Sequence, residues 1–154
     1  MREVIITLLF AVLVVLGCPD WLATQEVPYW TRAMVYPFFH ANIFHLALNC
    51  LCIWTMFHPR FKDRWRVLIL GYLISVLVYG LSIHPVIGIS NILFAIVGMR
   101  TPPFTHKWWR SKNALIFLGV NLLMVFVPKI SAVTHIASFI IGVIIAHIHR
   151  WSGR

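Results

Sequence analysis

Long apolar runs alternate with short polar or charged segments along this sequence of 154 residues. A helix that crosses a bilayer needs about 20 apolar residues, because the hydrocarbon core is about 30 Å thick and a helix rises about 1.5 Å per residue. The pattern predicts an all-α membrane protein, a compact bundle of six transmembrane helices that forms one domain over residues 1–154. The predicted spans cover residues 4–18, 38–57, 67–83, 88–99, 113–127 and 130–148.

The fourth apolar run is too short to cross a bilayer. From Gly88 to the charge at Arg100 it supplies only about 18 Å of helix, so this helix must begin inside the membrane. Non-helical backbone at that depth is tolerated only where protein buries it or where it lines a wet cavity. The lead-in 85–88 therefore predicts an internal polar pocket, and Ser90 is expected to face it from the top of the helix.

Composition and charge support the membrane class and fix an orientation. Hydrophobic residues make up 60% of the chain, against about 45–50% in soluble domains. The net charge of +9 comes from basic loops beside apolar spans, which indicates topology signals and lipid contacts, and not nucleic-acid binding. All of the 13 Lys and Arg residues except Arg32 and Lys129 fall on one predicted side. The positive-inside rule makes that side cytoplasmic, with both termini there, most simply in the cell membrane.

Two N-terminal segments need separate interpretation. The run 4–18 could be a signal peptide, but no small-residue cleavage site follows it, so we expect it to be retained. Residues 20–39 are rich in Trp and Tyr, whose rings settle at the headgroup level of a bilayer. We expect this segment to be irregular and to lie in the outer interface.

The second run carries the polar motif HANIFHLALN, with His40, His45 and Asn49. His45 and Asn49 are four residues apart and share one helix face. Each alone is more simply a packing residue satisfied by neighbouring helices, but together they favour a site. Cys50 and Cys52 point in different directions along the helix, so we expect neither a metal site nor a disulfide there, and no cofactor.

Four polar residues on three helices fall at a common depth. Measured from the cytoplasmic end of each span, Ser90, His45, Asn49 and His135 all lie about 12–20 Å up. A hydroxyl, two imidazoles and an amide in one layer can form an acyl-transfer site, with serine as nucleophile, one histidine as base and the others as oxyanion donors. A lone intramembrane serine is usually a packing residue, and the agreement in depth favours the site.

Three motifs make the chain resemble the rhomboid intramembrane serine proteases over nearly its whole length. HANIFHLALN resembles the second-span pattern of that family. GISNILFAIVG resembles the G-x-S-G segment that opens the fourth span, and THIASFIIG resembles the A-H-x-x-G-x-x-x-G segment of the sixth span. The order and spacing of the three motifs match a minimal six-span member.

The resemblance implies a role for each matching residue. Ser90 is the nucleophile and His135 its general base, a dyad without an acidic third member. His45 and Asn49 supply side-chain donors to the oxyanion, beside the backbone N–H of Ser90, which is free because Ser90 opens a helix. Phe94 matches an aromatic position that packs on the catalytic imidazole.

Small residues on the sixth predicted helix support the same arrangement. Ser138, Gly142 and Ala146 repeat at every fourth position and form a ridge that lets this helix approach the fourth closely. Gly88 matches the first glycine of the G-x-S-G motif. The predicted activity is serine endopeptidase cleavage of a single-span membrane protein near its extracytoplasmic end, with lipids and such substrates as partners.

Two positions depart from the family pattern, because Asn91 and Ser138 stand where glycine is usual. One hypothesis is that the Asn91 amide bonds the Ser138 hydroxyl across the helix interface, so that the added volume keeps the distance between the two candidate catalytic residues. The alternative is that Asn91, rotated about 100° from Ser90 around the helix, faces the second or fifth helix. The main alternative to an active protease is a rhomboid-like pseudoprotease that binds or escorts membrane helices without cutting them. A small channel or transporter is a third class, but no acidic relay residue lies within a span.

Overall fold

The computed structural model describes residues 27–56, 63–82, 86–100 and 131–152, together with positions 22, 115 and 119. All regular structure in these residues is helical. The α-helices are α2 (Tyr29–Val35), α3 (Ile43–Met56), α4 (Arg64–Val78), α5 (Ser90–Arg100) and α7 (Ala132–Ser152), and two 3₁₀ turns, η2 (Tyr36–Phe38) and η3 (Tyr79–Leu81), follow α2 and α4. The predicted helical class is confirmed for these ranges.

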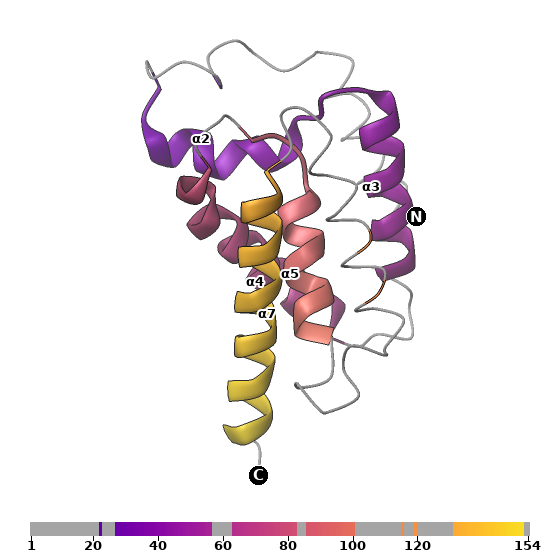
Figure 1. Cartoon of the computed structure of the whole chain (residues 1–154), viewed down its shortest axis with the longest axis vertical. Helices are drawn as coiled ribbons and strands as arrows, with labels where there is room; N and C mark the ends of the chain where they lie inside the picture. The colour runs from indigo at the N-terminus through magenta and orange to yellow at the C-terminus, as the bar shows by residue number, and fades with distance from the viewer. Residues whose placement is uncertain are drawn as a thin grey trace.

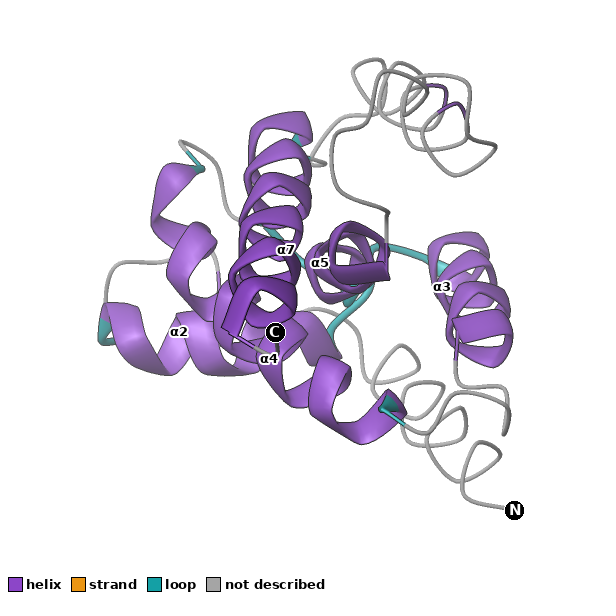
Figure 2. Ribbon diagram, turned by 90° about the horizontal axis from the view of Figure 1, so that it is seen from below, coloured by secondary structure: helices purple, strands orange, loops and turns teal. Residues whose placement is uncertain are grey.

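The helices α4, α5 and α7 pack side by side, and α3 stands on the far side of α5 from α7 (Figures 1 and 2). The short helix α2 lies across the end of the bundle at which α5 and α7 begin (Figure 1). A continuous apolar core joins α3, α4 and α5, with α7 side chains packed against it. The bundle therefore brings the start of α5, the start of α7 and the start of α3 to one end.

Four predicted spans coincide with observed helices. Residues 38–57, 67–83, 88–99 and 130–148 correspond to α3, α4, α5 and α7, and α5 is the short helix that begins at Ser90 as predicted. The predicted spans 4–18 and, apart from two isolated positions, 113–127 lie outside the described residues. The number of six spans remains a prediction.

No helix within the described ranges combines the length and the apolar character that crossing a membrane requires.

The prediction that residues 20–39 are irregular is wrong over residues 29–38, which form α2 and η2. Its aromatic residues are weak helix formers, so the pattern gave no helical signal. Tertiary contacts hold the helix instead. Ala33 and Tyr36 are buried, and the Tyr72 hydroxyl of α4 donates a hydrogen bond of 2.8 Å to the Met34 carbonyl near the end of α2, where carbonyls lack helical partners.

The predicted close approach of the sixth predicted helix to the fourth is confirmed between α7 and α5. A Cβ added at Gly142 would collide with the Ala95 carbonyl of α5, and one added at Gly98 would collide with the Phe139 carbonyl of α7. Glycines thus face backbone from both helices. The two backbones can lie in contact only because neither position carries a side chain.

Candidate active site

Ser90 is the first residue of α5, and a tight turn places it there. Gly88 has a φ of 109°, a conformation that side chains disfavour, and its N–H donates a hydrogen bond of 3.1 Å to the Tyr36 carbonyl. A Cβ at Gly88 would also lie 2.6 Å from Cε1 of His45. Glycine is therefore required here both by the backbone turn and by the imidazole against it.

His135 lies in the first turn of α7, whose start is capped by Ser131. The Ser131 hydroxyl accepts the Thr134 N–H at 3.4 Å, the arrangement of an N-cap residue, and the His135 N–H donates to the Ser131 carbonyl at 3.3 Å. The cap fixes where α7 begins. It thereby fixes the height of the imidazole relative to the start of α5.

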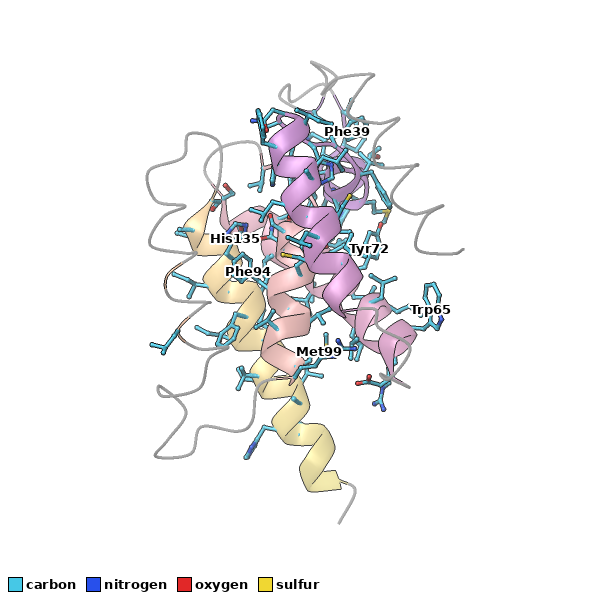
Figure 3. All side chains as sticks on the ribbon, turned by 90° about the vertical axis from the view of Figure 1, so that its right-hand side faces the viewer. Phe39, Trp65, Tyr72, Phe94, Met99 and His135 are labelled. Atoms are coloured by element: carbon cyan, nitrogen blue, oxygen red, sulfur yellow. The ribbon has the colours of Figure 1, made fainter. Side chains whose placement is uncertain are left out.

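Ser90 and His135, 45 residues apart in sequence, meet in the structure. The Ser90 Oγ lies 2.9 Å from the His135 Nε2, and both side chains are buried. The Phe94 ring, one turn along α5, packs on the imidazole at a centroid distance of 4.4 Å and an interplanar angle of 30°. Figure 3 shows Phe94 and His135 facing each other from the two helices. The structure thus brings Ser90, His135 and Phe94 together.

The tautomer of His135 decides whether its Nε2 donates to or accepts from the Ser90 hydroxyl. Its Nδ1 is buried and has no hydrogen-bond partner in the described part of the chain, so no carboxylate there orients the ring. If Nδ1 carries the proton, the Nε2 lone pair faces the Ser90 hydroxyl and can accept its hydrogen. A buried neutral imidazole in this pose is suited to act as a general base.

His45 and Asn49 lie on α3 at the side of the Gly88 turn. Asn42 caps α3, since its Oδ1 accepts the His45 N–H at 2.8 Å, and the His45 ring rests against Gly88. The His40 ring lies 5.2 Å from that of His45, at 62°. The His45 Nδ1 and the Asn49 Nδ2 are buried without hydrogen-bond partners among the described residues. Both atoms can therefore form a hydrogen bond with a bound ligand.

The hypothesis of a hydrogen bond between Asn91 and Ser138 is wrong. The Asn91 Nδ2 donates instead to the Tyr36 hydroxyl at 2.9 Å, and the Ser138 Oγ is buried without a partner in the described ranges. Asn91 is rotated about 100° from Ser90 around the helix, which turns it away from α7 toward η2 and α4. The sequence did not reveal Tyr36 as the partner, because it lies 55 residues before Asn91. A buried polar residue where the family usually has glycine nevertheless indicates that a hydrogen-bond partner must be present.

Tyr36 is held tightly in its protonated state. It is fully buried, and loss of hydration raises the pKa of its hydroxyl to about 12. The hydroxyl donates to the Ser75 carbonyl of α4 at 3.1 Å while it accepts from Asn91. Within the described residues, no cluster of three or more His, Cys, Asp or Glu side chains could hold a metal ion.

A model of the Rhomboid domain matches residues 27–152, which include every helix described above. The chain belongs to the rhomboid family. Searches of curated proteins and of solved structures each give no match. Rhomboids are integral membrane proteins and are generally serine intramembrane proteases. The matched residues include Ser90 and His135, the hydrogen-bonded pair that joins α5 to α7.

Proposed function

We propose that this rhomboid is an active intramembrane serine endopeptidase in which Ser90 and His135 form the catalytic dyad. The observation that carries the proposal is the distance of 2.9 Å between the Ser90 Oγ and the His135 Nε2 in a buried setting. A serine hydroxyl is a weak nucleophile until a base within hydrogen-bond reach accepts its proton. The neutral imidazole is that base.

The reaction has two steps. The Ser90 Oγ attacks the carbonyl carbon of the scissile peptide bond as its proton passes to the His135 Nε2. The tetrahedral intermediate then expels the amine, which takes the proton from Nε2, and leaves an acyl group on Ser90. A water molecule, deprotonated by the same nitrogen, attacks the acyl carbonyl and releases the acid, which restores the serine.

The oxyanion of the intermediate is stabilised by three donors in this proposal. The Ser90 backbone N–H is one of the amides without a helical partner at the start of α5. The His45 ring and the Asn49 Nδ2 are the others, because each presents a buried polar atom without a partner in the described residues. Donors held in place before the reaction stabilise developing charge at little reorganisation cost.

The remaining assignments concern the membrane. We place the chain in the cell membrane as a six-span protein with both termini in the cytoplasm, on the strength of the basic loops. Its substrates are single-span membrane proteins cut near their extracytoplasmic end, with water admitted from that side. Apolar side chains on the outer faces of α3, α4 and α7 contact lipid, among them Phe44, Leu73 and Ile140.

A pseudoprotease is the competing candidate, and Asn91 is the observation that favours it. This fully buried side chain fills a position next to Ser90 where the family usually has glycine. Neither group of the dyad is missing, however, and the Asn91 amide points to Tyr36, not toward His135. The volume is accommodated on the side of α5 that faces away from the dyad.

Cleavage in vesicles tests the proposal. The purified protein is reconstituted with a panel of single-span membrane proteins that carry different residues near the extracytoplasmic end, and product termini are read by mass spectrometry. The expected result is one internal cut in at least one substrate by the wild type and none by Ser90→Ala. Binding of substrates without any cut, by a folded wild type, would establish the pseudoprotease.

A further inference from the structure

Tyr36 contacts the residues on both sides of Ser90. Its backbone carbonyl accepts the Gly88 N–H at 3.1 Å, and its side-chain hydroxyl accepts the Asn91 Nδ2 at 2.9 Å. One residue from outside α5 therefore holds the turn at two points, and Ser90 lies between them. Hydrogen bonds at both ends of a four-residue turn fix its position and its rotation about the helix axis.

Tyr36 is itself fixed by α4 and η3. Its hydroxyl donates to the Ser75 carbonyl at 3.1 Å, and its ring packs on Tyr79 at a centroid distance of 4.8 Å and 30°. The Ser75 hydroxyl donates in turn to the Tyr72 carbonyl at 2.7 Å. The turn is thus anchored to the bundle core through a chain of buried contacts.

The direction of the bond to Asn91 follows from the chemistry of a hydroxyl. A tyrosine hydroxyl has one hydrogen, and that of Tyr36 is used on the Ser75 carbonyl. The hydroxyl can therefore only accept from residue 91, which must be a donor. Glycine, the usual residue of the family at this position, has no side chain to donate, and an apolar residue would leave the hydroxyl oxygen without its second partner.

We propose that Tyr36 and Asn91 are positioning residues that set the Ser90 Oγ against the His135 Nε2, an inference that rests on the proposed function. Asn91 is then an adaptation of this chain, in which a side-chain bond fixes the first turn of α5. The glycine contacts between α5 and α7 hold the body of α5, but Gly98 lies two turns from Ser90. The two hydrogen bonds of Tyr36, to Gly88 and to Asn91, hold the end of α5 that carries Ser90.

The expected effect is on the chemical step. Misplacement of a reacting group by about 1 Å can lower a rate about 10²-fold without changing how the reagent binds. Tyr36→Phe removes the hydroxyl and keeps the ring, while Asn91→Leu removes the donor at similar volume and leaves the Tyr36 bond to Ser75 intact. Tyr72→Phe is the control, because it also removes a tyrosine hydroxyl that donates to a carbonyl, here an exposed bond between α4 and α2 that does not touch α5.

The experiment measures the labelling of Ser90 by a fluorophosphonate probe, with the protein in lipid vesicles and the rates normalised to the folded fraction. For Tyr36→Phe and Asn91→Leu we expect the maximal labelling rate to fall about tenfold to a hundredfold, with the half-saturating probe concentration within about twofold. The double variant should be no slower than the slower single variant, since both break the same bond. Tyr72→Phe should keep its rate within about twofold.

Three outcomes overturn the inference in distinguishable ways. A wild-type rate in folded Tyr36→Phe and Asn91→Leu overturns the positioning role alone. A faster rate in Asn91→Leu shows that Asn91 restrains the serine and overturns it too. If the folded wild type is not labelled at Ser90, the proposed function fails and the inference fails with it. Should Tyr36→Phe not fold, Asn91→Leu decides, because it keeps the tyrosine anchor.

Discussion

The proposed catalytic groups are divided between two regions that differ in packing. The dyad lies on α5 and α7, whose backbones touch at Gly98 and Gly142, and α5 buries eight of its side chains or glycines. The proposed oxyanion donors lie on α3. This helix buries Leu46, Asn49 and Ile53 but exposes an apolar face made of Ile43, Phe44, Leu48 and Leu51. Ser90 and His135 lie on closely packed helices, while the proposed donors lie on a helix with one side exposed.

This difference indicates a division of tasks. The Ser90 to His135 contact needs a fixed geometry before substrate arrives, because proton transfer depends on a short, aligned hydrogen bond. The α3 donors act on charge that exists only after attack, so they contribute to the rate and not to the resting contact between Ser90 and His135. Substitutions on the packed helices α5 and α7 should therefore affect both catalysis and stability most strongly. Substitutions on α3 should lower the rate more than they lower the stability.

The largest expected effect is at the dyad. His135→Ala should abolish cleavage, because no other buried base lies within hydrogen-bond distance of the Ser90 Oγ among the described residues. The fold should persist, since single hydrogen bonds in membrane bundles contribute about 0.6 kcal/mol on average. Cleavage in vesicles and thermal unfolding measure the two results. Residual cleavage at the wild-type rate would remove His135 from the mechanism.

On α3, Asn49→Ala and His45→Ala should each slow cleavage about 10²- to 10³-fold and leave labelling-competent, folded protein. An oxyanion contact acts mainly on the transition state, so the change should appear in kcat with KM nearly unchanged. Steady-state kinetics on the same substrate checks this. Unchanged turnover in both variants would return these residues to a packing role.

The close packing of α7 against α5 is tested by adding one methyl group at Gly142. Gly142→Ala should destabilise the protein by about 1–3 kcal/mol, because its Cβ meets the Ala95 carbonyl and the two helices must separate. Gly119→Ala is the matched control, since a Cβ at that position meets no atom within 4 Å. Denaturant unfolding in detergent measures the difference. Equal stability of the two variants would mean that α5 and α7 do not pack as described.

A smaller effect is expected at alkaline pH. The raised pKa of Tyr36 means that the unfolded chain releases this proton first, so stability is full below pH 10 and falls toward pH 12. The loss should be about 1.4 kcal/mol at pH 11, one unit above the pKa of an exposed tyrosine, since one pKa unit corresponds to that free energy. Tyr36→Phe lacks this component, and unfolding of both proteins between pH 9 and about 11.5 measures it. Parallel pH profiles of the two proteins would contradict the burial of the hydroxyl.

The smallest effect is expected on the open face of α3. Phe44 is 82% exposed, so Phe44→Ala should change stability by less than about 0.5 kcal/mol. Ile96, fully buried on α5, provides the contrast, because Ile96→Ala should cost about 2–5 kcal/mol. Unfolding of the two variants side by side gives the comparison. Similar losses would show that α3 is packed as tightly as α5.

Local features of the site were predictable from the sequence, and its long-range partners were not. The short run after Gly88 placed the start of a helix at Ser90, and the four-residue spacing of His45 and Asn49 placed both on α3. For Asn91, by contrast, the sequence suggests Ser138 as the partner, whereas the structure shows a hydrogen bond to Tyr36. Helical periodicity fixes the direction of a side chain only relative to its own helix, and the partner depends on how helices pack.

The same reason explains the helix α2. Its residues carry little intrinsic helical preference, and its C-terminal end is held by Tyr72 and by the burial of Tyr36, contacts that join segments about 40 residues apart. Tertiary packing overrides weak local propensity in such a segment. Tyr36 directly follows α2, so the contact to Asn91 that the sequence did not reveal comes from this part of the chain.

The central claim is that His135 activates Ser90, and chemical modification tests it most directly. The folded protein in lipid is treated with diisopropyl fluorophosphate, and the modified residue is mapped by mass spectrometry. We expect one adduct, on Ser90, that is lost in His135→Ala. A folded wild type without an adduct on Ser90, or an equal adduct in His135→Ala, would contradict it.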